Sequence, residues 1–231
     1  MSKKNVNNRA LRKDKKRNPQ KGINILEGAL KVFGEKGFEA TTISAISKAA
    51  NVSEATLYEY FSSKEEVLFA IPKLYTQNEL DRMTQVIPYI HGPKEKIRVI
   101  IQAYLEFYEK NPLYTSVALL TLKGNRNFIK SDAYQVIRES ARFIIMAFNE
   151  GLGKGVFRDD LDPYLVRNMV LGFIEHLTIQ WLLVGRPERI SQYRDTIFHM
   201  VMRAIEKEKD SGGIELKVKV EGINIQDGLL T

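Results

Sequence analysis

Apolar residues recur every three or four positions along most of the chain, which is the period of an α-helix. Two stripes are the clearest, one from Ile97 to Tyr108 and one from Ile190 to Ala204. Strand-like alternation of apolar and polar residues is absent before residue 214. The pattern therefore predicts an all-α body of about nine helices, at residues 21–36, 43–50, 54–61, 64–86, 93–110, 112–123, 131–151, 163–184 and 187–208.

Prolines mark where these helices begin, because the first helical position needs no backbone N–H donor. Four of them are predicted to open helices: Pro93, Pro112, Pro163 and Pro187. Pro72 instead lies inside the helix predicted at 64–86. An interior proline removes one hydrogen bond and clashes with the preceding turn, so we expect a kink near residues 68–72.

The tail departs from the helical pattern. Apolar residues alternate with charged ones from Ile214 to Val220, and Gly222 then precedes Ile223 and Ile225. This period of two predicts a short strand or hairpin, which is stable only beside a partner. A loose tail is the alternative interpretation.

Composition excludes several kinds of site. The 231 residues contain no cysteine and only three histidines, none of them close in sequence. A disulfide scaffold, a thiolate metal site and a multi-histidine site are therefore not expected. The chain also lacks a zinc-protease motif, a P-loop and a nucleophile elbow. We predict no catalytic residue, no metal and no cofactor, and keep a helical enzyme only as an alternative.

The net charge of +7 is unevenly distributed. Residues 1–21 contain nine Lys or Arg and one Asp, which gives +8, so the rest of the chain is nearly neutral. Such an arm is typical of proteins that meet nucleic acid or an anionic membrane surface, and a solvated tail is the third interpretation. The arm carries few bulky apolar residues, which disfavours a membrane helix.

No apolar run follows the arm as it would in a signal peptide. The most apolar stretch, 164–184, contains Arg167, Asn168, Glu175 and His176, which are costly inside a bilayer. We therefore predict a cytoplasmic protein with no membrane partner.

Residues 42–61 predict two short helices joined by a tight turn. Ile43 and Ile46 give the first helix an apolar face, and Ser53 can cap the second by accepting from the N–H of residue 55 or 56. Leu57 and Phe61 lie four positions apart and face inward. This arrangement is a helix-turn-helix, whose second helix enters the major groove of DNA.

Three separated motifs give this region a family resemblance. Residues 37–43 read GFEATTI, residues 52–61 read VSEATLYEYF, and residues 63–66 read SKEE. Together they resemble the N-terminal domain of TetR-family transcriptional regulators, over roughly residues 19–79. Asn51 and Ala55 depart from a family pattern that often has glycine; Asn51 suits a left-handed turn.

The resemblance implies DNA contacts by Thr56, Tyr58 and Tyr60, and a phosphate contact by Lys64. The alternative for both tyrosines is packing within the domain. Lys64 and Thr41 or Thr42 also lie where helix starts favour a phosphate. The full candidate set for DNA is Thr41, Thr42, Ser53, Glu54, Ala55, Thr56, Tyr58, Tyr60 and Lys64.

Residues 22–61 contain three bases and five acids, a net −2. A module of that charge binds a polyanion weakly, because affinity depends on the number of phosphates neutralised. We therefore expect the arm to supply much of the charge contact, by entering the minor groove.

The resemblance also implies that residues 80–209 form a helical ligand-binding and dimerisation domain, between an arm at 1–18, disordered by expectation, and a tail at 210–231. Residues 164–184 are apolar nearly all round, so that helix is expected to be buried on most sides. Two such helices from each of two subunits would form a homodimer that fits a palindromic operator. A monomeric bundle is the alternative.

Aromatic and polar residues at core-like positions are the pocket candidates. Arg142 could hold an anionic head group, although a solvated charge is the alternative, and His176 could equally be a core histidine. The set is Tyr104, Phe107, Tyr108, Arg142, Phe143, Met146, His176 and Trp181.

Residues 155–163, GVFRDDLDP, and the apolar helix after them resemble the fatty-acyl-CoA-sensing subgroup of the family. The resemblance implies an acyl or other apolar effector, with aromatic drug-like ligands as the competitor. The predicted function is a homodimeric repressor that an effector releases from double-stranded operator DNA by shifting the helix at 64–86.

Overall fold

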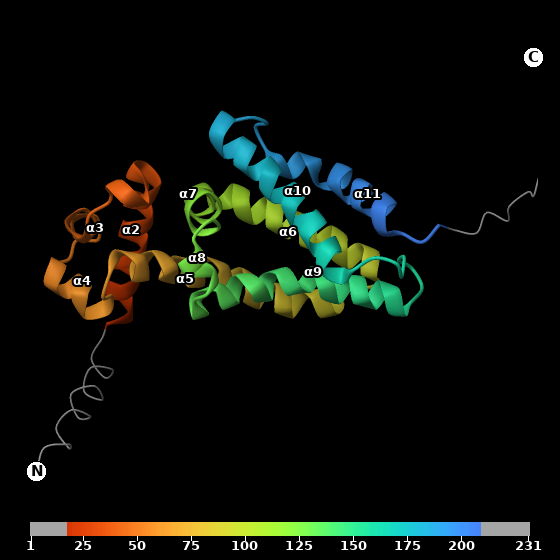
Figure 1. The fold of residues 1–231 in the computed structure, drawn as a ribbon, viewed down its shortest axis with the longest axis horizontal. Coiled ribbons are helices and arrows are strands. Elements are labelled where there is room, and N and C mark those ends of the chain that lie inside the picture. The colour runs from red at the N-terminus through yellow and green to blue at the C-terminus, as the bar shows by residue number, and fades with distance from the viewer. Residues whose placement is uncertain (1–17, 209–231) are drawn as a thin grey trace, which may run out of the picture.

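The computed structural model describes residues 18–208, and these are helical almost throughout (Figure 1). One isolated bridge, between Phe157 and Glu206, is the only β-pairing among them. The all-α prediction is thus confirmed for the part of the chain that the structure describes. The basic arm up to residue 17 and the alternating segment from residue 214 lie outside it. The α-helices are α2 (Pro19–Ala40), α3 (Ile43–Ala49), α4 (Glu54–Tyr60), α5 (Lys64–Val86), α6 (Pro93–Lys110), α7 (Pro112–Val117), α8 (Arg126–Ile129), α9 (Gln135–Gly153), α10 (Pro163–Val184) and α11 (Arg194–Ile205).

Helices α2, α3 and α4 form a small lobe at one end of the molecule, and α5 runs from it into the larger body (Figure 1). The lobe closes tightly because α2 has a glycine where α3 ends. A Cβ on Gly28 would lie 2.7 Å from the backbone nitrogen of Ala50. Since a real Cβ does not approach that closely, the small side chain lets the two backbones touch.

Helix α5 belongs to both parts of the molecule. Its first half buries Val67, Leu68 and Ile71 in the core of the lobe, whereas Met83 lies in the core of the body. The backbone is helical through Pro72, which is buried. One helix therefore connects the two cores directly.

The lobe core extends beyond the first five helices in sequence. Tyr114 and Val117 of α7, Leu122 and Phe128 all pack in the same buried cluster as Leu57 of α4. The predicted boundary at residue 79/80 divides the chain by sequence position only. Helices α7 and α8 follow this boundary in sequence but pack against the lobe.

The body consists of α6, α9, α10 and α11, with α9 beside the second half of α5 (Figure 1). Its core contains many aliphatic side chains, among them Ile97, Ile101 and Leu105 of α6, Ile144 of α9 and Ile174 of α10. All five side chains are fully buried, as the helical stripes predicted.

The predicted helix 187–208 was wrong at its start. Helix α10 ends at Val184 and is capped by Gly185, which is left-handed at φ 71°, and a 3₁₀ turn, η4 (Ile190–Tyr193), precedes α11. The backbone N–H of Ser191 in that turn donates to a Glu109 carboxylate oxygen at 2.7 Å. Glu109 is on α6, so the start of the 3₁₀ turn η4 is fixed by a residue distant in sequence and not by Pro187.

The predicted helix 112–123 is α7 followed by a π-helical turn, η2 (Ala118–Leu122). The short helix α8 was not predicted, because four residues are too few to show a helical period. Its cap is Asn125, whose side chain accepts from the N–H groups of Asn127 and Phe128 at 2.9 and 3.1 Å.

Candidate functional site

The helix-turn-helix is held by caps from its own sequence. The Thr42 side chain accepts from the N–H of Ala45 at 3.1 Å and begins α3. The Ser53 hydroxyl accepts from the N–H of Thr56 at 3.1 Å and begins α4. Between the two helices Asn51 has φ 53°, the left-handed conformation that asparagine tolerates. The predicted motif is therefore confirmed in both its helices and its turn.

The outer face of α4 is open to solvent. Glu54 and Ala55 are exposed at its start, and Tyr58 is 54% exposed. Leu57 on the opposite face is fully buried. The N-terminal half of α4 is thus free to approach base edges, as a recognition helix requires.

The prediction that the Thr41 side chain contacts DNA needs correction. Its side chain is only 2% exposed, and its hydroxyl donates to the carbonyl of Gly37 at 2.7 Å. A buried hydroxyl that satisfies the end of α2 cannot reach DNA. Thr42, one residue later, is exposed and keeps the predicted position.

Lys64 lies in the first turn of α5, as expected, but its ammonium is occupied. It donates to the backbone carbonyls of Phe38 at 2.7 Å, Thr41 at 2.9 Å and Glu39 at 3.3 Å. These three bonds use all the protons of the ammonium and satisfy the carbonyl end of α2. The phosphate contact stays a prediction, and it would have to replace one of these bonds.

Tyr60 was predicted to contact DNA, with packing within the domain as the alternative, and the structure shows the packing. Its hydroxyl donates to the carbonyl of Asn18 at 3.0 Å, and its ring lies against Gly22. Asn18 also caps α2 by accepting from the N–H of Gln20 at 2.9 Å. The phenol therefore ties the recognition helix to the residue where the basic arm ends, and DNA contact by Tyr60 stays a prediction.

A cavity of about 350 Å³ lies in the body, enclosed by α5, α6, the α7–η2 segment, α9 and α10. Small-molecule sites commonly measure roughly 300–1,000 Å³. Four predicted pocket residues line it: Tyr104, Phe107, Tyr108 and Phe143.

Arg142, Met146, His176 and Trp181 do not line the cavity. Arg142 and Met146 lie four positions apart on the solvent face of α9, whereas Ala141 faces the cavity. His176 is exposed on α10, and Trp181 packs against the body core. A helix turns 100° per residue, so one position decides between cavity and solvent.

The interior of the cavity carries hydroxyl groups. Tyr104 donates to the Ser140 hydroxyl at 3.2 Å, and Ser140 donates to the carbonyl of Ile137 at 2.9 Å. The hydroxyls of Thr76 and Tyr114 lie 2.8 Å apart. Burial raises the pKa of both Tyr104 and Tyr114 to about 12, so these phenols are neutral at physiological pH.

Charged side chains line the more exposed part of the cavity. The cations are Lys123, Arg138 and Arg167, and the acids are Glu79 and Glu175. Lys123 forms an ion pair with Glu175 of α10, and burial lowers the pKa of its ammonium. An anionic group on a bound molecule would therefore find cations beside the apolar interior.

Several of these residues were missed in the sequence. Thr76, Lys123, Arg138, Ser140 and Arg167 looked like ordinary helix-surface residues, because no local pattern shows that five segments converge on them. The one available sequence signal for the cavity lining is on α10. The helical period there places Leu171 on the same face as Asn168, Gly172 and Glu175.

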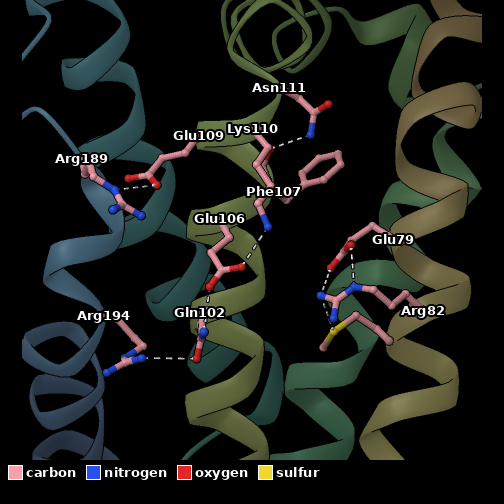
Figure 2. Close-up of polar contacts among 11 residues, drawn as sticks. Glu79, Arg82, Gln102, Glu106, Phe107, Glu109, Lys110, Asn111, Arg189 and Arg194 are labelled. Carbon is pink, nitrogen blue, oxygen red and sulfur yellow. Dashed lines mark hydrogen bonds and ion pairs between the residues drawn. The ribbon is translucent and has the colours of Figure 1, made fainter.

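The opposite face of α6 is polar (Figure 2). The Gln102 amide donates to Glu106 at 2.7 Å and thereby lowers the pKa of that carboxyl, with Lys110 adding a bond at 3.2 Å. Arg82 binds Glu79 on the neighbouring α5 at 2.9 Å. Each of these pairs joins residues of the same helix, which is typical of a solvated helix face and contributes little to stability.

One face of α10 and α11 is apolar and uncovered within a single chain. The large exposed side chains are Tyr164, Leu165, Met169, Phe173, Leu183 and Val184 on α10 and Met200 on α11. The expectation that α10 is buried on most sides is thus not met by one chain. Contiguous apolar surface of this kind marks a protein interface.

In the described residues, no three His, Asp or Glu side chains are placed to hold a metal ion. No helix of residues 18–208 is both long and apolar enough to cross a membrane.

Comparison with known proteins identifies both parts of the chain. Residues 25–71 match the family model described as bacterial regulatory proteins of the tetR family. Residues 76–204, more than half of the chain, match the model of the C-terminal region of YsiA-like proteins, which is also a TetR-type domain. The two matches meet within α5.

Individual relatives cover nearly the same span. The fatty acid metabolism regulator protein of Bacillus subtilis is 22% identical over 80% of this chain and 95% of its own length. The transcriptional repressor KstR2 of Mycobacterium tuberculosis is 24% identical over 80% of this chain and 92% of its own. A crystal structure of the transcriptional regulator FadR from B. subtilis in complex with stearoyl-CoA superposes with a TM-score of 0.72, at 22% identity, over 78% of this chain and 96% of that one.

Proposed function

Because the chain belongs to the TetR family of bacterial regulatory proteins, we propose that it is a homodimeric repressor that a long-chain acyl effector releases from a palindromic operator. The family makes it a DNA-binding, ligand-responsive transcriptional regulator, and its relatives are regulators and not enzymes. The acyl effector, the release of DNA and a cytoplasmic location are the proposed parts.

The observation that carries the proposal is the chemistry of the cavity. Its interior is lined by aromatic and aliphatic side chains such as Phe107, Phe143 and Leu171, and its exposed part has Arg138 and Arg167. An apolar chain that ends in phosphates would use both regions. A neutral drug-like ligand would make no use of these cations, although Lys123 and Arg167 already have partners within the protein.

The stearoyl-CoA bound by the B. subtilis FadR, whose fold is similar, supports the same chemical class. Acyl-CoA thioesters have the required shape, with one apolar end and one anionic end. KstR2, named a ketosteroid regulator in its crystal structure, has a similar fold at a TM-score of 0.64. A rigid polycyclic acyl group therefore belongs in the same series of test ligands.

Helix α7 offers a short route from the cavity to the recognition unit. Tyr114 lines the cavity, and Leu113 beside it lies over Gly34 of α2, so close that a Cβ there would meet its side chain. A ligand that displaces Tyr114 would push Leu113 against α2. Release of DNA requires that the ligand bind the two arrangements of α2 with different affinity.

The dimer is proposed to form through the exposed apolar face of α10 and α11. Phe173 and Met169 belong to this face and are 44% and 37% exposed in the single chain. Two subunits paired there would present two α4 helices to successive major grooves, about 34–36 Å apart.

The testing experiment measures operator binding by fluorescence anisotropy while stearoyl-CoA or free CoA is added. We expect stearoyl-CoA to release the operator and free CoA to leave it bound. Ala141→Leu, which adds volume inside the cavity, should reduce the response to stearoyl-CoA without changing affinity for DNA. The matched variant Met146→Leu on the solvent face of the same helix should respond like the wild type. Operator binding unaffected by any acyl-CoA would contradict the proposed effector.

A further inference from the structure

The cavity is mostly apolar, yet its hydroxyl groups have more hydrogen-bond donor protons than there are acceptors for them among the described residues. The Tyr104 and Ser140 protons are both accounted for, by Ser140 and by the carbonyl of Ile137. Thr76 and Tyr114 share one bond, and either oxygen can donate. Whichever donates, the other hydroxyl proton has no acceptor among the residues that the structure describes.

Tyr108 adds a second such donor. Its side chain lines the cavity, is only 7% exposed, and forms no hydrogen bond with another described residue. Burial raises the pKa of this phenol well above its ordinary value, so it keeps its proton at physiological pH. A neutral phenol in such a place is a donor that needs an acceptor.

The two donors belong to residues that pack near one aromatic ring. The ring centroid of Phe107 is 6.0 Å from that of Tyr108 and 5.6 Å from that of Tyr114. Thr76, bonded to Tyr114, is 6% exposed and comes from α5. Residues of three helices thus bring two hydroxyl protons to one region of the apolar wall.

We propose that Tyr108 and the Thr76–Tyr114 pair form a buried subsite that donates hydrogen bonds to a neutral carbonyl oxygen of the effector. The proposal rests on the acyl effector proposed above and specifies how its polar atom is recognised. A carbonyl accepts the surplus protons, whereas a ligand N–H would leave them without acceptors.

A carboxylate is the less suitable occupant. Buried charge needs a paired charge, whereas the ring and hydroxyl contacts of Tyr108 and Tyr114 are all with uncharged side chains: Phe107, Tyr104, Tyr75 and Thr76. Lys123 and Arg138 line the cavity from exposed positions. The anionic part of the effector therefore belongs near those cations, and its neutral carbonyl near the phenols.

The carbonyl could be the thioester group or an oxo group within the chain, and three ligands distinguish them. Palmitoyl-CoA has the thioester carbonyl, S-hexadecyl-CoA is the thioether that lacks it, and an oxo-palmitoyl-CoA has an additional one in the chain. Their dissociation constants are measured by titration calorimetry on the full chain. An unsatisfied buried donor typically weakens binding by about tenfold.

For a thioester subsite we expect the wild type to bind palmitoyl-CoA about tenfold more tightly than S-hexadecyl-CoA. Tyr108→Phe should bring that ratio close to one by weakening only the carbonyl ligand. For an in-chain subsite, the wild type should instead prefer the oxo-acyl ligand, and Tyr108→Phe should abolish that preference. Either result supports the subsite and identifies the source of the oxygen.

Tyr75→Phe is the matched control, because Tyr75 stacks on Tyr114 at 5.0 Å but does not line the cavity. It should keep the wild-type ratios. Equal affinity of the wild type for all three ligands would overturn the subsite, and this comparison needs no variant to fold. Failure of the proposed function looks different, since then none of the three ligands binds.

Discussion

The recognition lobe and the cavity body are built from the same kind of helix but are specified over different ranges of sequence. In the lobe, Ser53 caps a helix through a residue three positions away. In the body, Tyr104 and Ser140 are 36 positions apart, and the start of η4 depends on Glu109, 82 positions before Ser191. Local sequence therefore determines the caps and the turn of the helix-turn-helix, although contacts such as Tyr60 to Asn18 also shape the lobe, whereas the ligand site depends on tertiary packing throughout.

The two regions also use their hydroxyl groups differently, although the one fully buried side-chain polar atom without a hydrogen-bond partner among the described residues, Ser47 Oγ, lies in the lobe. The caps of α3, α4 and α5 satisfy helix N-termini with hydroxyls from Thr42, Ser53 and Ser63. The cavity, by contrast, keeps hydroxyl donors at Tyr108 and the Thr76–Tyr114 pair without protein acceptors. A surface that reads DNA needs a fixed shape, whereas a ligand site needs unused bonding capacity.

The largest effect is expected from Leu57→Ala. Leu57 is fully buried between α4 and the rest of the lobe, and such a truncation typically costs about 2–5 kcal/mol. Because the lobe is small, we expect operator binding to be lost, measured by anisotropy. Binding of stearoyl-CoA should weaken less than operator binding, since Leu57 does not line the cavity, although Tyr114, Leu122 and Phe128 of the same buried cluster do. Loss of both activities together would show that the two regions unfold as one.

This difference in range explains what the sequence could predict. The helix-turn-helix, its cap at Ser53 and the left-handed Asn51 follow from neighbouring residues, and the structure confirms them. The cavity candidates divided evenly between lining and not lining, because helical period places a residue on a face without saying what that face meets. Thr41 failed for a related reason: its burial depends on the end of α2, not on the start of α3.

Alkaline pH should destabilise the protein through its buried phenols. The pKa of Tyr114 is raised to about 12 by burial, against an ordinary value of 10.0. Below pH 10 both the folded and the unfolded chain keep this proton. From pH 10 to 12 only the unfolded chain loses it, so the free energy of unfolding falls, by roughly 2–3 kcal/mol for one such group.

Urea unfolding of the wild type and Tyr114→Phe at pH 9 and pH 11 measures this fall in the free energy of unfolding. The variant should lose less stability between the two pH values than the wild type. Tyr89→Phe is the control, because Tyr89 is 80% exposed. Equal losses in wild type and Tyr114→Phe would mean that Tyr114 is accessible to base in the folded state.

The basic arm is expected to contribute charge to the lobe without contributing shape. Deleting residues 2–16 removes seven Lys or Arg and keeps Asn18, which caps α2 and accepts from Tyr60. Each lost phosphate contact lowers the slope of log affinity against log salt by about 0.9. We expect operator affinity to fall about tenfold or more at low salt.

Anisotropy titrations between low and moderate salt measure this slope for the deletion and the full chain. Ligand affinity should be the same in both, since the cavity lies in the body. An unchanged slope would assign the operator contacts to the lobe alone, despite its net negative charge.

The smallest effect is expected from removing one local cap. Ser53→Ala deletes the hydroxyl that accepts from the N–H of Thr56 at 3.1 Å, and loss of such a cap typically costs about 1 kcal/mol. Ser53→Asp retains an acceptor and is the matched variant for stability. Because α4 has only seven residues, we expect Ser53→Ala to lower both the thermal stability of the lobe and operator affinity, and Ser53→Asp to restore the stability. Since the cap acts within three residues, affinity for stearoyl-CoA should stay constant. A change in ligand affinity would show that the start of α4 is coupled to the cavity through α5, and that the two regions are less independent than their sequence ranges indicate.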